Sequence, residues 1–156
     1  MKLHSLLSED LIIPDLKSVT RDEILKEIVK FLKSGDRISR DKDLYDKLIQ
    51  REKLGSTAIG DGIAVPHCKL KGVKSPLLVL GVSHKGVDFD SLDGKPSHLF
   101  FLVVSSPDDP TMSLQILAVI AKLIRKAAAL PRRVMEARSP KAIIEIVRDE
   151  EDKPHG

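Results

Sequence analysis

The segment from Arg51 to Lys69 holds most of the side chains in this sequence that could do chemistry. It reads R-E-K-L-G-S-T-A-I-G-D-G-I-A-V-P-H-C-K, so glycines and two hydroxyls stand between an arginine and a histidine. Neutral imidazole is a good nucleophile near pH 7, and Arg51 could neutralise charge on incoming phosphoryl oxygens. The glycines let the backbone approach a ligand closely. The pattern therefore indicates phosphoryl transfer to a nitrogen of His67.

A second interpretation of this segment is a tight turn before a buried strand, with the imidazole of His67 satisfied in the core. That interpretation explains the glycines, but it leaves Arg51, Ser56, Thr57 and His67 together by coincidence. The residues alone leave both interpretations open.

Cys68 follows His67 directly and raises the alternative of a cysteine nucleophile. Adjacent residues of a strand point to opposite faces, so we expect the two side chains to diverge and predict no catalytic role for Cys68. It is the one cysteine of the chain, which excludes an internal disulfide and fits a reducing cytoplasm.

The elements that must position these residues alternate between helices and short apolar strands. Thr20 to Glu23 is a capping box that predicts a helix closed by Gly35, and a second helix is expected from Asp41 to about Arg51. A long helix is expected from about Thr111 to Ala128, and a last one starts at Ser139-Pro140. Its polar continuation after Val147 should fray. Buried strands are predicted at Ile63–Val65, Leu77–Val82 and His98–Val104.

The long helix is expected to bury a stripe of apolar residues. The predicted stripe is Leu114, Leu117, Ala118, Ala121 and Ile124.

This alternation predicts an α/β fold in a single layered domain. The domain is expected to cover residues 1–148, followed by a polar C-terminal tail at residues 149–156. At 156 residues the chain can bury a substantial core.

Composition limits the function classes. No apolar run reaches the roughly 20 residues of a membrane helix, and the N-terminus has no secretory signal, so we expect a cytoplasmic protein without membrane insertion. The net charge of +3 leaves nucleic-acid binding as an alternative, but the basic residues have no aromatic interleaving and no zinc-finger spacing. We therefore predict no nucleic-acid partner.

Three aspartates, Asp88, Asp90 and Asp93, are spaced as in a calcium loop. The EF-hand pattern needs an oxygen ligand where Leu92 stands, and no glutamate completes it. We predict neither a metal site nor a cofactor.

Three stretches of the chain resemble one family. Arg51–His67, Gly86–Pro107 and Ser113–Ile124 are similar to enzyme IIA of the phosphoenolpyruvate:sugar phosphotransferase system, of the fructose/mannitol type that includes nitrogen-regulatory IIA proteins. The resemblance spans about Leu3 to Val147. It implies a central mixed β-sheet flanked by helices on both faces.

The resemblance also implies a phosphohistidine relay. His67 would accept a phosphoryl group through Nε2 from an HPr-type phosphocarrier protein, and Arg51 would stabilise charge. Ser56 and Thr57 match a G-S-T element that binds phosphoryl oxygens. Ala58 replaces a glycine that is common in the family.

Ser113 stands where family members usually carry a second histidine. The remaining histidines, His4, His84, His98 and His155, are expected to be structural or solvated. Ser113 would lie in the first turn of its helix, where amides and a hydroxyl could still bind phosphate. The altered residue favours a nitrogen-regulatory phospho-switch acting on target proteins. The alternative is a sugar-specific IIA that passes phosphate to a IIB protein.

Overall fold

The centre of the fold is an antiparallel pair of long strands, β5 (Leu77–Val87) and β6 (Ser97–Ser105), in a computed structural model that describes residues 1–154. β1 (Ile12–Ile13) pairs in parallel with β5 on one side. On the other side β3 (Ile63–Ala64) and β4 (His67–Lys69) both pair in parallel with β6, and β2 (Ala58–Gly60) pairs with β3. The result is the mixed sheet that the family resemblance implied.

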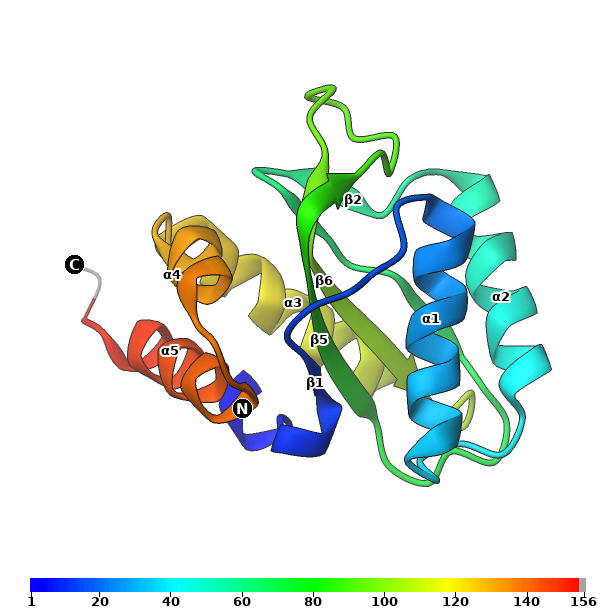
Figure 1. The fold of residues 1–156 in the computed structure, drawn as a ribbon. Coiled ribbons are helices and arrows are strands. Elements are labelled where there is room, and N and C mark those ends of the chain that lie inside the picture. The colour runs from blue at the N-terminus through cyan, green and yellow to red at the C-terminus, as the bar shows by residue number, and fades with distance from the viewer. Residues whose placement is uncertain (155–156) are drawn as a thin grey trace.

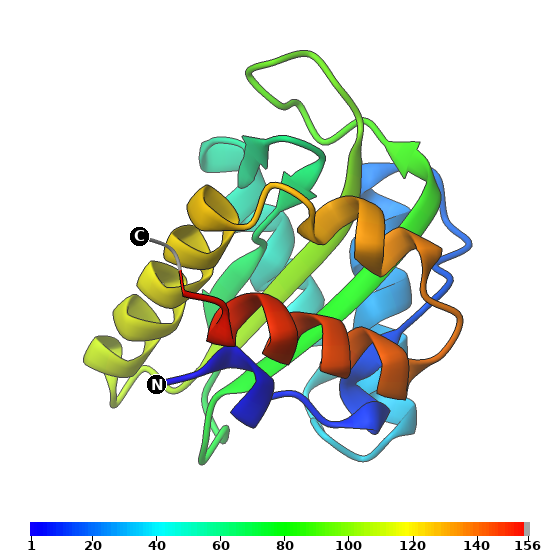
Figure 2. The same ribbon diagram turned by 90° about the vertical axis from the view of Figure 1, so that its left-hand side faces the viewer.

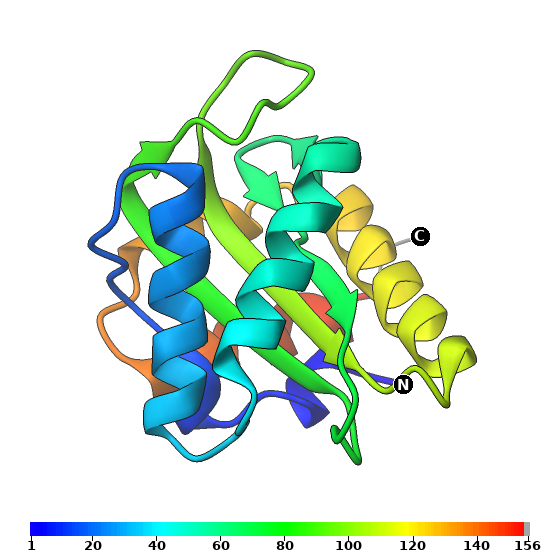
Figure 3. The same cartoon turned by 90° about the vertical axis from the view of Figure 1, so that its right-hand side faces the viewer.

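Two helical layers cover the two faces of this sheet (Figure 1). The first layer is α1 (Arg21–Ser34) with α2 (Asp41–Leu54), which lies in front in Figure 3. The second layer is α3 (Pro110–Lys126), α4 (Leu130–Glu136) and α5 (Pro140–Asp152), which lies in front in Figure 2. Two short 3₁₀ helices, η1 (Leu3–Ser5) and η2 (Glu9–Leu11), precede β1. No helix of residues 1–154 is long and apolar enough to cross a bilayer.

Alternate residues of β6 supply a separate core for each layer. Phe100 and Leu102 belong to the core beneath α1 and α2, whereas Phe101 and Val103 belong to the core beneath α3 to α5. Neighbouring strand residues point to opposite faces. A strand buried on both faces must therefore be apolar at nearly every position, as β6 is.

The helix boundaries follow local capping chemistry. The Thr20 side chain accepts a hydrogen bond from Glu23 N, and Gly35 follows the last residue of α1, which confirms the cap at Thr20 and the end of the helix. α3 begins at Pro110, close to the expected start, and is capped by Asp109, whose carboxylate accepts from Met112 N. α4 was not predicted.

The predicted apolar stripe of α3 is wrong at its centre, although Leu117 and Ile124 are partly buried against the core. The helix buries Ile116, Ile120 and Leu123, while Leu114 is 68% exposed. α3 carries apolar residues around more than one face, so the helical period alone could not select the face that meets the sheet. The tertiary packing of α3 against β6 and η1 makes that choice.

The prediction that the chain frays after Val147 is also wrong. α5 continues to Asp152, and the Glu151 side chain is buried, with its carboxylate accepting from Leu3 N at 2.7 Å and His4 N at 2.9 Å. The same carboxylate lies 2.8 Å from His4 Nδ1. These partners come from the other end of the chain, so a polar terminal sequence gave no sign of them. His155 lies outside the described residues.

We predict that Glu151→Ala destabilises the fold by about 2 kcal/mol, because it leaves two backbone N–H groups and an imidazole without their acceptor. For a domain of this size that loss corresponds to roughly 4–8 °C in melting temperature. Asp152→Ala is the matched control, since within residues 1–154 Asp152 forms one ion pair, with Lys2 at 3.5 Å, and both side chains are about half exposed. Thermal unfolding of both variants checks this, and equal losses would contradict the role given to Glu151.

Candidate active site

His67 lies at the point where two short strands meet on the same partner. β3 ends at Ala64, and β4 begins at His67. His67 was expected to follow the end of a strand, and it is instead the first residue of the next strand. Pro66 between them has no N–H to donate, but its carbonyl accepts from Val103 N at 2.9 Å, which keeps the pairing to β6 continuous. His67 is thereby fixed opposite Val103 and remains half-buried.

A single hydrogen bond determines which nitrogen of His67 keeps a free lone pair. Nδ1 lies 2.8 Å from the carbonyl oxygen of Val65. A carbonyl only accepts, so Nδ1 carries the proton of the neutral ring, and Nε2 keeps its lone pair. The backbone two residues away therefore orients the imidazole and leaves the lone pair of Nε2 without a proton.

His67 borders a hollow of about 370 Å³ between the two helical layers. The hollow brings together three residues that are distant in sequence, His67 of β4, Arg51 of α2 and Ser113 of α3. Its other lining residues are Lys47, Gln50, Leu54, Cys68 and Lys69.

Arg51 occupies the last turn of α2, as expected. One of its terminal nitrogens, Nη1, donates to the carbonyl of Gly55 at 2.7 Å. A guanidinium has five N–H groups in a fixed plane, so this bond orients Arg51 and leaves donors for a bound oxyanion.

Lys47 and Lys69 are cationic lining residues that the sequence analysis missed. The spacing of these lysines from Arg51 and His67 could have identified them. Lys47, Arg51 and Leu54 stand at i, i+4 and i+7 on one face of a helix, and Lys69 is two residues from His67 on a strand. The site consequently carries three permanent cations around one imidazole.

Ser56 and Thr57 do not line this hollow. The Thr57 hydroxyl donates to the buried carboxylate of Glu52, and Thr57 N donates to the same group at 3.1 Å. The Ser56 hydroxyl donates to Phe89 O. These bonds shape the turn between α2 and β2, and the phosphate-binding role of both residues stays a prediction.

Ser113 is the fourth residue of α3, and it is 8% exposed, in the first turn as expected. The amides of that turn are less available than the sequence suggested. Pro110 has no N–H, and Met112 N already donates to the Asp109 carboxylate. The hydroxyl of Ser113 is therefore the principal group that this position offers to the site.

Cys68 is not suited to act as a nucleophile. It packs against the core beneath α1 and α2, and burial raises the pKa of its thiol to about 12, an effect that nearby Lys47 only partly offsets. The thiolate is the reactive form, and it is scarce at neutral pH.

The other described histidines have structural partners away from the site. His4 contacts Glu151, while His84 Nε2 lies 3.1 Å from Met135 O and His98 Nδ1 lies 2.8 Å from Ser83 O. The carboxylate of Asp88 accepts from Asp90 N, and that of Asp93 accepts from Lys95 N and Asp61 N.

The sequence of the chain matches a known protein family. Residues 5–150 match the family described as the phosphoenolpyruvate-dependent sugar phosphotransferase system, EIIA 2. A nitrogen regulatory protein of Bradyrhizobium diazoefficiens is 30% identical over 94% of this chain and 95% of its own. The fructose-specific EIIABC component of Bacillus subtilis is 31% identical over 94% of this chain, which spans only 23% of that protein.

A solved structure agrees with these sequence relatives. The nitrogen regulatory protein IIA-Ntr of Neisseria meningitidis superimposes with a TM-score of 0.79 at 27% identity, covering 93% of this chain and 98% of that one. Because the family matches nearly the whole chain and the fold is shared, the chain belongs to the EIIA type 2 family of the phosphotransferase system.

Proposed function

We propose that the protein carries a phosphoryl group on Nε2 of His67, received from an HPr-type phosphocarrier protein, and acts as a nitrogen-regulatory phospho-switch. The observation that supports this most is the 2.8 Å contact between His67 Nδ1 and the Val65 carbonyl, because it leaves Nε2 unprotonated. A phosphohistidine on the donor is the substrate, and phosphoenolpyruvate is its ultimate source. These partners imply a cytoplasmic setting.

The transfer needs no cofactor. The lone pair of Nε2 attacks phosphorus, the Nε2–P bond forms, and the P–N bond of the donor breaks with its electron pair returning to the donor ring. Catalysis of such steps is mostly positioning and charge stabilisation. Arg51, Lys47 and Lys69 line the hollow and supply positive charge for the phosphoryl oxygens.

The regulatory hypothesis is supported by Ser113 and by the likeness to a nitrogen regulatory protein. Family members usually place a second imidazole where Ser113 lies, and this chain offers a hydroxyl there. The chain also matches 95% of a nitrogen regulatory protein.

The second candidate is a sugar-specific IIA that passes its phosphate to a IIB protein. The likeness to the fructose-specific EIIABC component supports it. Onward transfer is the step that separates the two candidates.

We predict that His67 is the sole phosphorylated residue. Incubation with phosphoenolpyruvate, enzyme I and an HPr-type protein should add the mass of one phosphoryl group to the intact protein, and His67→Ala should abolish that addition. His84→Ala is the control, because this half-exposed histidine lies away from the site and should leave phosphorylation unchanged. A phosphoryl mass that survives in His67→Ala would overturn the assignment.

We predict that Arg51 acts on the charge of the transferring group. Arg51→Ala should slow phosphorylation of His67 by about 10²–10³-fold, since an arginine on a transferring phosphoryl group is worth several powers of ten in related chemistry. Arg51→Lys should recover part of the rate, because a point charge lacks the bidentate fork. Single-turnover rates measure both effects.

Lys53→Ala is the matched control for Arg51, as Lys53 lies exposed in the same turn of α2 and does not line the hollow. It should keep the native rate. A normal rate in Arg51→Ala, or the loss of its folded state, would refute a charge-stabilising role.

We predict that Ser113→His raises transfer to a family IIB protein more than it raises uptake from HPr. A second imidazole beside His67 would balance charge as the P–N bond of phospho-His67 breaks, whereas uptake is already supported by Arg51 and the lysines. Single-turnover rates of the two steps, compared between the native and variant proteins, measure the difference. Equal effects on both steps would make Ser113 a general phosphate contact and remove the main support for the regulatory reading.

A further inference from the structure

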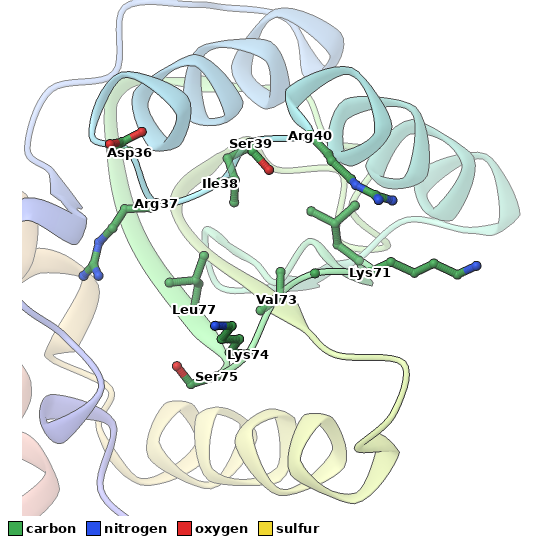
Figure 4. A pocket seen from close by; sticks show the side chains of 12 residues that line it. Asp36, Arg37, Ile38, Ser39, Arg40, Lys71, Val73, Lys74, Ser75 and Leu77 are labelled. Atoms are coloured by element: carbon green, nitrogen blue, oxygen red, sulfur yellow. The ribbon is translucent and has the colours of Figure 1, made fainter.

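A second hollow lies next to the active site and shares no lining residue with it. It encloses about 380 Å³ between the connection from α1 to α2, residues 36–40, and the connection from β4 to β5, residues 70–77 (Figure 4). Its wall begins at Leu70, immediately after the strand that carries His67.

The floor of this hollow is apolar. Ile38 and Leu70 are buried, and Val73 and Leu77 are half-buried. In Figure 4 the side chains of Ile38 and Leu77 point toward each other from opposite walls. This floor would favour the carbon body of a ligand over bound water, because burial of apolar surface is favourable.

The rim is cationic, and most of its charge is uncompensated. Arg40, Lys71 and Lys74 line the hollow against one carboxylate, Asp36. Arg40 has only a long contact of 3.9 Å to Asp43. Within residues 1–154, neither Lys71 nor Lys74 forms an ion pair. The fourth cation, Arg37, is already held, at 3.3 Å from Asp10 Oδ2.

We propose that this hollow binds a small organic anion, with a phosphate or carboxylate at the rim that Arg40, Lys71 and Lys74 make positive and a carbon body resting on Ile38 and Leu77. The volume equals that of about a dozen water molecules and lies in the range of small-ligand pockets. A protein partner fits the site less well, since lysine is depleted in protein interfaces.

The test uses the whole unphosphorylated protein and phenyl phosphate as the probe. Titration followed by ¹H–¹⁵N NMR should give saturable shifts in the amides of residues 36–40 and 70–75. Lys71→Gln with Lys74→Gln should weaken binding roughly five- to tenfold, the loss expected for two exposed charge contacts. Inorganic phosphate, which lacks the carbon body, should bind at least about tenfold more weakly than phenyl phosphate.

Lys26→Gln with Lys30→Gln is the matched control, because both lysines are exposed on α1 and the change in net charge is the same. It should leave the affinity within about twofold. Equal weakening by the two pairs, shifts centred on His67 and Ser113, or equal binding of inorganic phosphate would each overturn the proposal. A leucine peptide flanked by aspartates that binds where phenyl phosphate does not would assign the hollow to a protein partner and overturn it too.

Discussion

The shared pairing of β3 and β4 with β6 is the constraint on which the candidate site depends. Two short strands separated by Val65 and Pro66 hydrogen-bond to one long strand, and β6 is buried on both faces. The carbonyl of Pro66 continues the pairing and that of Val65 turns to the imidazole of His67. A fully packed strand thus fixes the imidazole of His67 at one end of a two-residue interruption. Backbone placed in this way cannot shift without breaking bonds to the core.

The hollow beside His67 lies where the two helical layers meet, so both layers contribute polar and charged side chains to it. α2 presents Lys47 and Arg51 from one layer, and α3 presents Ser113 from the other, across the strand that carries His67. No short sequence segment could supply all of these groups. Leu54 also lines the hollow, and its apolar side chain is largely exposed. An exposed apolar group beside these charges would suit contact with another protein.

The sequence predicted what depends on local chemistry. The Thr20 cap, the Gly35 stop and the two-faced burial of β6 follow from neighbouring residues, and all three are confirmed. Arg51 and His67 lie together because a motif contains both. The sequence did not identify which face of α3 is exposed, because apolar residues occur on more than one face of this helix. The structural bonds of Ser56 and Thr57 depend on Phe89 and on the buried Glu52, neither of which a turn pattern identifies as a partner.

The carboxylate of Glu151 also has a topological consequence. It binds the amides of Leu3 and His4, so η1 packs beside α5 (Figure 2), and the first and last elements of the domain meet at one place. A fold whose ends are adjacent behaves almost as a closed ring, since little chain entropy is needed to join them. Such a unit can be placed inside a longer polypeptide, or joined to other domains at either end, with both connections leaving from the same side.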